Sequence, residues 1–198
     1  MKKLLAMVLV LVFALSLTAS AEFTYGNYTH PTQGYSIVYP QEWLLMDNET
    51  IVSLINNPSM AQEFSHIDFG AYIQQIQSSD MAMFMNENGD NFNVTSVYIG
   101  APFTADQLVQ YLMPDLVEQC KSIMPGIEML VSGDTAVFGD TEFAYVLYTY
   151  EGMIGAQYCI CESGTLYYLT LTCNQINDTW EYLKVQKMFE KVLESFKE

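Results

Sequence analysis

The side chains that most often perform acid–base or metal chemistry are scarce in this sequence. Its only histidines are His30 and His66, and neither stands in a His-x-x-x-His or Cys-x-x-Cys spacing, so a zinc site is not supported. His30 precedes a proline and is expected in a turn, while His66, close to two acidic residues, fits a solvated helix start better than a metal site. No Gly-x-Ser-x-Gly, Ser-x-x-Lys, Walker or dinucleotide glycine pattern occurs. The sequence therefore predicts a protein that is not an enzyme, with no catalytic, cofactor-binding or metal-binding residue and no cofactor.

Carboxylates are abundant, and two kinds of site could use them. Residues 86–91, Asn-Glu-Asn-Gly-Asp-Asn, superficially resemble a calcium loop, but they lack its twelve-residue spacing and its closing bidentate glutamate. A hairpin turn explains this segment, because Asn-Gly is a strong hairpin signal. Weak calcium binding stays open as an alternative. A hydrolase that uses paired carboxylates in a cleft is a second alternative, since sequence spacing does not reveal such pairs.

The four cysteines allow at most one disulfide. Cys159 and Cys161 are two residues apart in a strand-like run, so their side chains point to the same face and do not bridge each other. A turn between the two strands places Cys173 opposite residue 154 or 155, roughly 13 Å along the ladder from Cys159 and too far to bond. Only Cys120, on the preceding helix, could bridge Cys159, Cys161 or Cys173. Four buried free thiols are the favoured alternative, because cysteine packs as a small apolar residue.

Three methionines suggest the one candidate ligand groove. Met81, Met83 and Met85 alternate with other apolar residues in a strand-like run, so they share one face of a sheet. Core packing is the expected role. The alternative is a soft apolar groove for a peptide or lipid-like ligand. Exposure of the three side chains would favour the groove, and burial would favour packing.

The first 21 residues have the pattern of a signal peptide. Lys2 and Lys3 make a basic start, an apolar run covers residues 4–17, and residues 19–21 are Ala-Ser-Ala. The apolar run is shorter than the about 20 residues that a membrane span needs, and no second apolar block of that length follows. We expect cleavage near Ala21–Glu22, no lipid-anchoring cysteine, and a single domain over residues 22–198 that is secreted or extracytoplasmic and does not span a membrane. An uncleaved N-terminal anchor is the alternative.

The charge balance is strongly acidic. Two of the seven basic residues lie in the expected signal peptide, which leaves five against 23 acidic residues and a net charge of −18. There is no arginine, so binding to nucleic acid or to anionic lipid heads is disfavoured. Solubility is the expected role of the acidity, and a specific cationic partner is the alternative. Because 51% of the residues are hydrophobic, the chain is globular rather than disordered.

The elements that would position these residues follow from periodicity and turn signals. A first hairpin spans 23–29 and 35–39, a short strand is expected at 51–55, helical turns within 58–77, and a second hairpin over 81–85 and 92–99. A helix begins at Thr104, which with Gln107 satisfies the capping-box pattern, kinks at Pro114 and ends at Pro125. Its buried stripe is expected at Leu108, Leu112, Leu116, Cys120 and Ile123.

The second half of the chain predicts an antiparallel meander followed by a helix. Strands are expected at 127–138, 143–151, 156–162 and 165–173, with turns at 139–140, 152–155 and 163–164 that are too short for parallel crossovers. The last helix covers about 179–196. The fold class is therefore α+β, an antiparallel sheet covered by helices, with both faces covered in an α/β/α sandwich.

Both ends of the chain resemble a known family. Residues 34–43, Gly-Tyr-Ser-Ile-Val-Tyr-Pro-Gln-Glu-Trp, resemble the G-(F/Y)-S-(I/F)-x-(Y/F)-P-x-x-W signature that opens PsbP-like domains and related exported bacterial proteins. Residues 167–172 resemble the last strand of the family, and residues 189–197 resemble its closing F-x-x-(I/V)-L-x-S-F-K helix. The matching positions are structural anchors: Gly34, Tyr35, Pro40, Trp43, Phe189 and Phe196.

The resemblance implies an α/β/α sandwich that is usually non-catalytic. Relatives serve as extrinsic subunits of a photosynthetic complex, as envelope lipoproteins and as a Ran-binding import factor, and fold alone does not transfer any of these roles. We therefore expect a secreted, monomeric, non-enzymatic binding or assembly domain. It would act through a surface on the sheet or its loops, on an unknown protein or a small apolar ligand.

Overall fold

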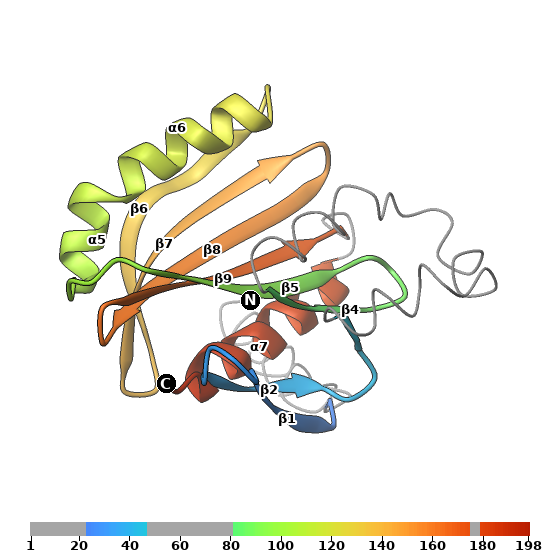
Figure 1. Ribbon diagram of the computed structural model, residues 1–198. Helices are drawn as coiled ribbons and strands as arrows, with labels where there is room; N and C mark the ends of the chain where they lie inside the picture. The colour runs from blue at the N-terminus through green and yellow to red at the C-terminus, as the bar shows by residue number, and fades with distance from the viewer. Residues whose placement is uncertain (1–22, 47–80, 175–178) are drawn as a thin grey trace, which may run out of the picture.

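The computed structural model describes residues 23–46, 81–174 and 179–198 (Figure 1). The expected signal peptide, the expected short strand at 51–55, the helical turns within 58–77 and His66 lie outside the described residues. Among the helices that are described, none combines the length and the apolar character needed to cross a bilayer.

The described part of the chain is built on an antiparallel sheet of seven strands, ordered β3-β4-β5-β9-β8-β7-β6, and a separate hairpin of β1 and β2. The expected meander is confirmed, since β6, β7, β8 and β9 are consecutive neighbours, and β9 then pairs with β5. The strands are β1 (Tyr25–Thr29), β2 (Ser36–Pro40), β3 (Leu44–Met46), β4 (Ala82–Met85), β5 (Asn91–Tyr98), β6 (Glu128–Phe138), β7 (Thr141–Tyr150), β8 (Met153–Glu162) and β9 (Thr165–Cys173).

The two faces of the sheet are covered by different elements. Helices α5 (Ala105–Tyr111) and α6 (Met113–Ile123) lie on one face, and helix α7 (Thr179–Ser195) lies with the β1–β2 hairpin on the other (Figure 1). Each face has its own apolar cluster. Phe92 and Leu169 belong to the α7 side, whereas Val146 and Cys159 belong to the α5–α6 side. The predicted α+β sandwich is therefore the observed architecture.

The expected helix after Thr104 is divided in two. The capping box is present, and α5 gives way to α6 at Leu112, just before Pro114 in the first turn of α6. The break shifts the buried stripe of α6 to Met113, Leu116, Val117 and Cys120, the i, i+3, i+4, i+7 pattern of a helix face. The prediction that Ile123 is buried is therefore wrong. Its side chain is 68% exposed, and the stripe continues at Met124 instead.

Two local features differ from the expected elements. The turn expected at 152–155 is instead formed by two residues with positive φ, Glu151 at 49° and Gly152 at 84°, so β8 already begins at Met153. Two such residues make the tight turn whose twist matches the flanking strands. Strand β3 was not expected, because three residues are too few to show a period.

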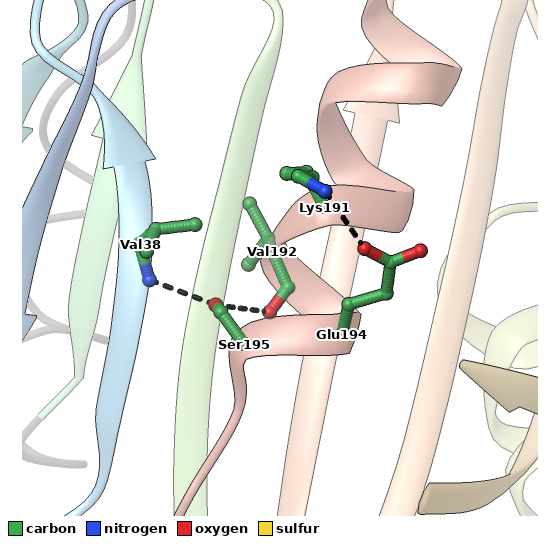
Figure 2. Close-up of polar contacts among 5 residues, drawn as sticks. All are labelled: Val38, Lys191, Val192, Glu194 and Ser195. Carbon is green, nitrogen blue, oxygen red and sulfur yellow. Dashed lines mark hydrogen bonds and ion pairs between the residues drawn. The ribbon is translucent and has the colours of Figure 1, made fainter. Parts of the chain in front are cut away.

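The first hairpin and the residues after α7 lie against each other. The backbones of Ser36 and Lys197 exchange hydrogen bonds of 2.7 and 3.0 Å, so the residues after α7 pair with β2. Figure 2 shows the adjoining contact: the Val38 N–H donates to the Ser195 hydroxyl over 2.8 Å, and this hydroxyl donates to the Val192 carbonyl over 2.7 Å. The side chains of the anchors Tyr35, Pro40, Trp43, Phe189 and Phe196 are buried, and Gly34 has a φ of +76° that favours glycine.

Candidate functional site

The candidate methionine groove is filled by packing. Met81, Met83 and Met85 are each at most 3% exposed. Met83 and Met85 pair with residues of both β3 and β5, so they stand inside the sheet rather than at its edge. Burial is the arrangement expected for core packing, and it leaves none of the three side chains at an open groove.

All four cysteines are free thiols. Cys173 lies opposite Ile154, as expected from the turn position. Cys120 and Cys159 are buried on the α5–α6 side, whereas Cys173 is buried on the α7 side, so the sheet separates Cys120 from Cys173. Cys161 is only half-buried. Burial raises the pKa of the Cys120 and Cys159 thiols, which keeps both protonated and unreactive.

The Asn-Gly segment forms the β4–β5 hairpin turn. Asn86 Oδ1 accepts hydrogen bonds from the backbone N–H groups of Asn88 and Asp90 at 3.0 and 2.9 Å. The Asp90 carboxylate, 1% exposed, accepts from Asn86 Nδ2 at 2.9 Å and from the Asn174 N–H at 2.8 Å. These oxygens therefore stabilise the turn itself. Within the described ranges, no group of three or more His, Cys, Asp or Glu side chains is placed to hold a metal ion.

His30 closes the turn between β1 and β2, the position expected from the proline that follows it. Its Nδ1 accepts hydrogen bonds from the backbone N–H groups of Thr32 at 3.4 Å and Gln33 at 3.2 Å. Because both donors are backbone amides, Nδ1 carries no proton in this arrangement. His30 is 4% exposed, and its ring centre lies 5.0 Å from that of Tyr35 with the two planes tilted by 35°, so the imidazole belongs to the packing of the hairpin.

A different part of the molecule exposes large apolar side chains. Val97, Tyr98 and Ile99, at the end of β5, are 46%, 76% and 40% exposed. Their backbone is held in place, because the N–H groups of Ile99 and Gly100 both donate to the Gly164 carbonyl in the β8–β9 turn. The apolar side chains are therefore presented on a fixed support.

A pocket of about 230 Å³ opens at the same end of the sheet. Three of its lining residues are acidic: Asp140 in the β6–β7 turn, Glu142 in β7 and Glu162 at the end of β8. Of the described residues that line it, none is basic. The remaining lining residues are Phe103, Thr104, Ala105, Leu108, Thr141, Ile160 and Cys161.

The register of the sheet relates the apolar residues to the pocket. Tyr98 pairs with Thr165, and Thr165 pairs with Glu162, so these three side chains form one row on the same face. Two strand spacings separate Tyr98 from Glu162, roughly 10 Å. We call Val97, Tyr98 and Ile99, together with Asp140, Glu142 and Glu162, the rim surface.

The walls of the pocket are fixed by local hydrogen bonds. The Thr104 hydroxyl accepts from the Gln107 N–H at 3.3 Å, and the Gln107 side chain accepts from the Thr104 N–H at 2.9 Å, which closes the first turn of α5. On the opposite wall, Cys161 Sγ donates to the Ala101 carbonyl at 3.4 Å. The pocket therefore lies between rigid element ends.

A second hollow, of about 320 Å³, lies at the β4–β5 turn. It is lined by Glu42, Glu87, Lys184 and aromatic residues, and Lys184 Nζ stands 5.1 Å from the centre of the Phe23 ring. Its lining residues carry both positive and negative charges. The side chain of Asn86, which also lines it, is hydrogen-bonded within the β4–β5 turn. It is a weaker candidate than the rim surface.

The rim surface was not recognised in the sequence. The run Val97-Tyr98-Ile99 falls in the strand predicted over residues 92–99, and alternate side chains of a strand are expected to pack against the core. The available signal was a run of three large apolar residues at the end of a strand, followed directly by Gly-Ala-Pro. The carboxylates of the pocket come from the β6–β7 turn, from β7 and from the end of β8, so only the pairing of β7 with β8 brings Glu162 to the other two.

Comparisons with known proteins bear on the fold. No family model and no curated protein matches the sequence. The cyanobacterial PsbP protein (CyanoP) of Synechocystis sp. PCC 6803 is 14% identical, with a TM-score of 0.56 over 90% of this chain and 95% of that chain.

Two further solved structures overlap more loosely. LpqN of Mycobacterium tuberculosis, described as involved in cell envelope biogenesis, is 10% identical, with a TM-score of 0.44 over 88% of this chain and 90% of its own. A protein of Bacteroides thetaiotaomicron VPI-5482 is 12% identical, with a TM-score of 0.48 over 86% of this chain and 47% of its own. The likeness to CyanoP, together with the antiparallel sheet and its helical layers, identifies the fold of this chain as PsbP-like.

Proposed function

We propose that the protein is an extracytoplasmic, non-catalytic binding domain that engages a protein partner through the rim surface. The observation that carries this proposal is the exposure of Tyr98, flanked by Val97 and Ile99, on a backbone fixed by two hydrogen bonds to Gly164. Clustered exposed apolar side chains mark interaction sites, and tyrosine is enriched among the residues that dominate binding energy. A rigid support reduces the entropy lost on binding.

The extracytoplasmic location is supported by the sequence of residues 1–21, with its basic start, apolar run and small residues before the expected cleavage site. The mature protein is then a single domain that begins near Glu22. The intact mass of the protein recovered from outside the cytoplasm tests this: we expect the mass of residues 22–198, and a mass that retains residues 1–21 would contradict it.

Site-directed crosslinking tests the binding surface. A photoreactive amino acid replaces Tyr98 in the full chain, and the same amino acid replaces Glu118, an exposed residue on α6, as the control. We expect a crosslinked protein at position 98 and none at 118. The captured protein, identified and purified, should bind the wild type and bind Tyr98→Ser at least about tenfold more weakly, as for a residue at the centre of an interface. Equal binding by Tyr98→Ser would contradict the proposal.

A carboxylate-based hydrolase is the second candidate, because three carboxylates line one pocket. The test is hydrolysis of chromogenic glycoside and ester substrates by the wild type and by Glu142→Gln and Glu162→Gln. Activity in the wild type that both variants lose would favour this candidate. Activity that persists equally in both variants would exclude these carboxylates.

A further inference from the structure

The rim surface combines an apolar group and negative charge at a defined separation. Tyr98 and Glu162 stand in the same cross-strand row, with Thr165 between them. On the other face of the sheet, Val97 pairs with Leu166, and Leu166 pairs with the pocket residue Cys161. On each face of the sheet, one exposed apolar residue thus lies two strands away from a residue that lines the pocket: Tyr98 from Glu162, and Val97 from Cys161. A ligand that contacts Tyr98 and the pocket must span roughly 10 Å.

Within the described residues, no positive side chain stands in the pocket beside its three carboxylates. In the described parts of α6 and α7, the ion pairs involve other acidic residues: Lys121 pairs with Glu118, and Lys191 pairs with Glu194. The described lining of the pocket contains no basic residue. A partner that covered the rim surface would remove water from Asp140, Glu142 and Glu162, and burying such groups without a positive charge is unfavourable.

We propose that the rim surface recognises an extended peptide segment of its partner that carries one apolar residue and one lysine or arginine. The apolar side chain lies against Tyr98, and the cationic side chain enters the pocket that Glu142 and Glu162 line. A separation of roughly 10 Å corresponds to about three residues of extended chain. This inference rests on the proposed function, because it names the chemistry of the partner at the same surface.

Other occupants fit the surface less well. A purely apolar ligand would leave the carboxylates buried without partners. Nucleic acid would be repelled by the acidic pocket. A cation alone would leave Tyr98 uncovered, and the described residues provide no cluster of three metal-ligating side chains. Charge complementarity therefore favours a basic peptide segment.

Peptide selection tests the inference without knowledge of the natural partner. The probe is a displayed library of random peptides, selected on the mature wild-type protein, with the enriched peptides then synthesised for titration calorimetry. We expect enriched peptides to carry a lysine or arginine about three residues from an aromatic or aliphatic residue. We also expect Glu142→Gln/Glu162→Gln to weaken their binding about tenfold, and added salt to weaken it further.

Matched variants separate the inference from the proposed function. The control for charge is Glu118→Gln/Glu128→Gln. It removes two exposed carboxylates that are not among the lining residues of the pocket, so the affinity for the peptide should stay unchanged. Loss of binding in Tyr98→Ser, with full binding in Glu142→Gln/Glu162→Gln, would overturn the inference and leave the proposed function standing. Enriched peptides that bind Tyr98→Ser as well as they bind the wild type, or a selection that enriches no peptide, would overturn both.

Discussion

At the scale of single residues, Tyr148 and Gly155 illustrate how one pair depends on the absence of a side chain. They lie opposite each other on β7 and β8, and a Cβ atom at position 155 would stand 2.2 Å from two ring carbons of Tyr148. Real atoms do not approach so closely, so the ring rests on bare backbone. A glycine that weakens a strand is retained here because an aromatic ring covers it.

Gly155→Ala should therefore destabilise the protein by about 1–3 kcal/mol, the usual cost of overpacking. The measurement is urea unfolding followed by circular dichroism. In a Tyr148→Ala background the obstacle is gone, and the same substitution should be neutral or stabilise by up to about 1 kcal/mol, because alanine loses less entropy than glycine. An equal loss in both backgrounds would show that the ring is not the cause.

Tyr148 also makes stability depend on alkaline pH. Burial, with a smaller contribution from the nearby Cys120, raises its pKa to about 12 from the ordinary value of 10. The folded state thus holds this proton more tightly than the unfolded state. Its contribution to stability is complete below about pH 10 and is lost as pH rises towards about 12. Tyr168, whose pKa burial also raises to about 12, acts in the same direction.

The free energy of unfolding, measured by urea titration between about pH 9 and pH 11, should fall with increasing pH. Tyr148→Phe removes one of the titrating groups, so its decline should be shallower than that of the wild type. Tyr98→Phe is the matched control, because Tyr98 is exposed, and its decline should equal that of the wild type. Identical slopes for wild type and Tyr148→Phe would contradict this assignment.

At the scale of elements, the contact between β2 and α7 depends on one hydroxyl. Ser195 accepts from the Val38 N–H and donates to the Val192 carbonyl, whereas the neighbouring Glu194 pairs with Lys191 at the surface, as Figure 2 shows. The first contact is partly buried, and the second is exposed to solvent. The two contacts should therefore contribute different amounts to the free energy of unfolding.

Ser195→Ala leaves the Val38 N–H without its hydrogen-bond acceptor and should cost about 1–2 kcal/mol in the free energy of unfolding. Glu194→Gln removes a surface ion pair and should cost at most about 0.5 kcal/mol. Both values come from urea unfolding at neutral pH. A larger loss in Glu194→Gln than in Ser195→Ala would contradict the assignment of this stabilising contact to the Ser195 hydroxyl.

The elements that could be predicted from sequence are those with long or well-punctuated patterns. The β6–β9 meander and α7 follow from turns and periodicity, and the burial of Phe189 and Phe196 follows from the terminal motifs. Strand β3 was missed because its three residues show no period, and Ile123 was misplaced because the break at Leu112 changes which face of the helix meets the sheet. The local sequence pattern does not show that the helix turns a different face to the sheet after this break.

The rim surface could not be predicted for a different reason. Tyr98 on β5 and Glu162 on β8 lie far apart along the chain, and only the pairing of β9 with both β5 and β8 brings them into one row. Exposure of an apolar strand end depends on what the rest of the chain covers, which sequence pattern does not specify. Fold was thus accessible from sequence, whereas the surface that the fold assembles was not.

At the scale of the whole molecule, one aromatic cluster joins segments from both ends of the chain. The ring of Phe196 lies 6.1 Å from Tyr35 in the first hairpin motif, 6.4 Å from Phe143 on β7 and 5.1 Å from Tyr167 on β9. The hairpin, the sheet and the end of the chain therefore share one core, although β1 and β2 form a sheet of their own. Such sharing predicts that the parts unfold together.

Phe196→Ala should remove contacts on all three sides and cost about 3–5 kcal/mol, as for a buried phenylalanine whose cavity does not collapse. Ile123→Ala, at an exposed position on α6, is the control and should cost less than about 0.5 kcal/mol. Near-ultraviolet circular dichroism reports aromatic packing and far-ultraviolet circular dichroism reports the backbone. The two signals should give one coincident urea transition in the wild type and one coincident, earlier transition in Phe196→Ala, because a shared core makes unfolding cooperative. If the hairpin were a separate module, Phe196→Ala would shift the aromatic transition and leave the backbone transition of the seven-stranded sheet where it was.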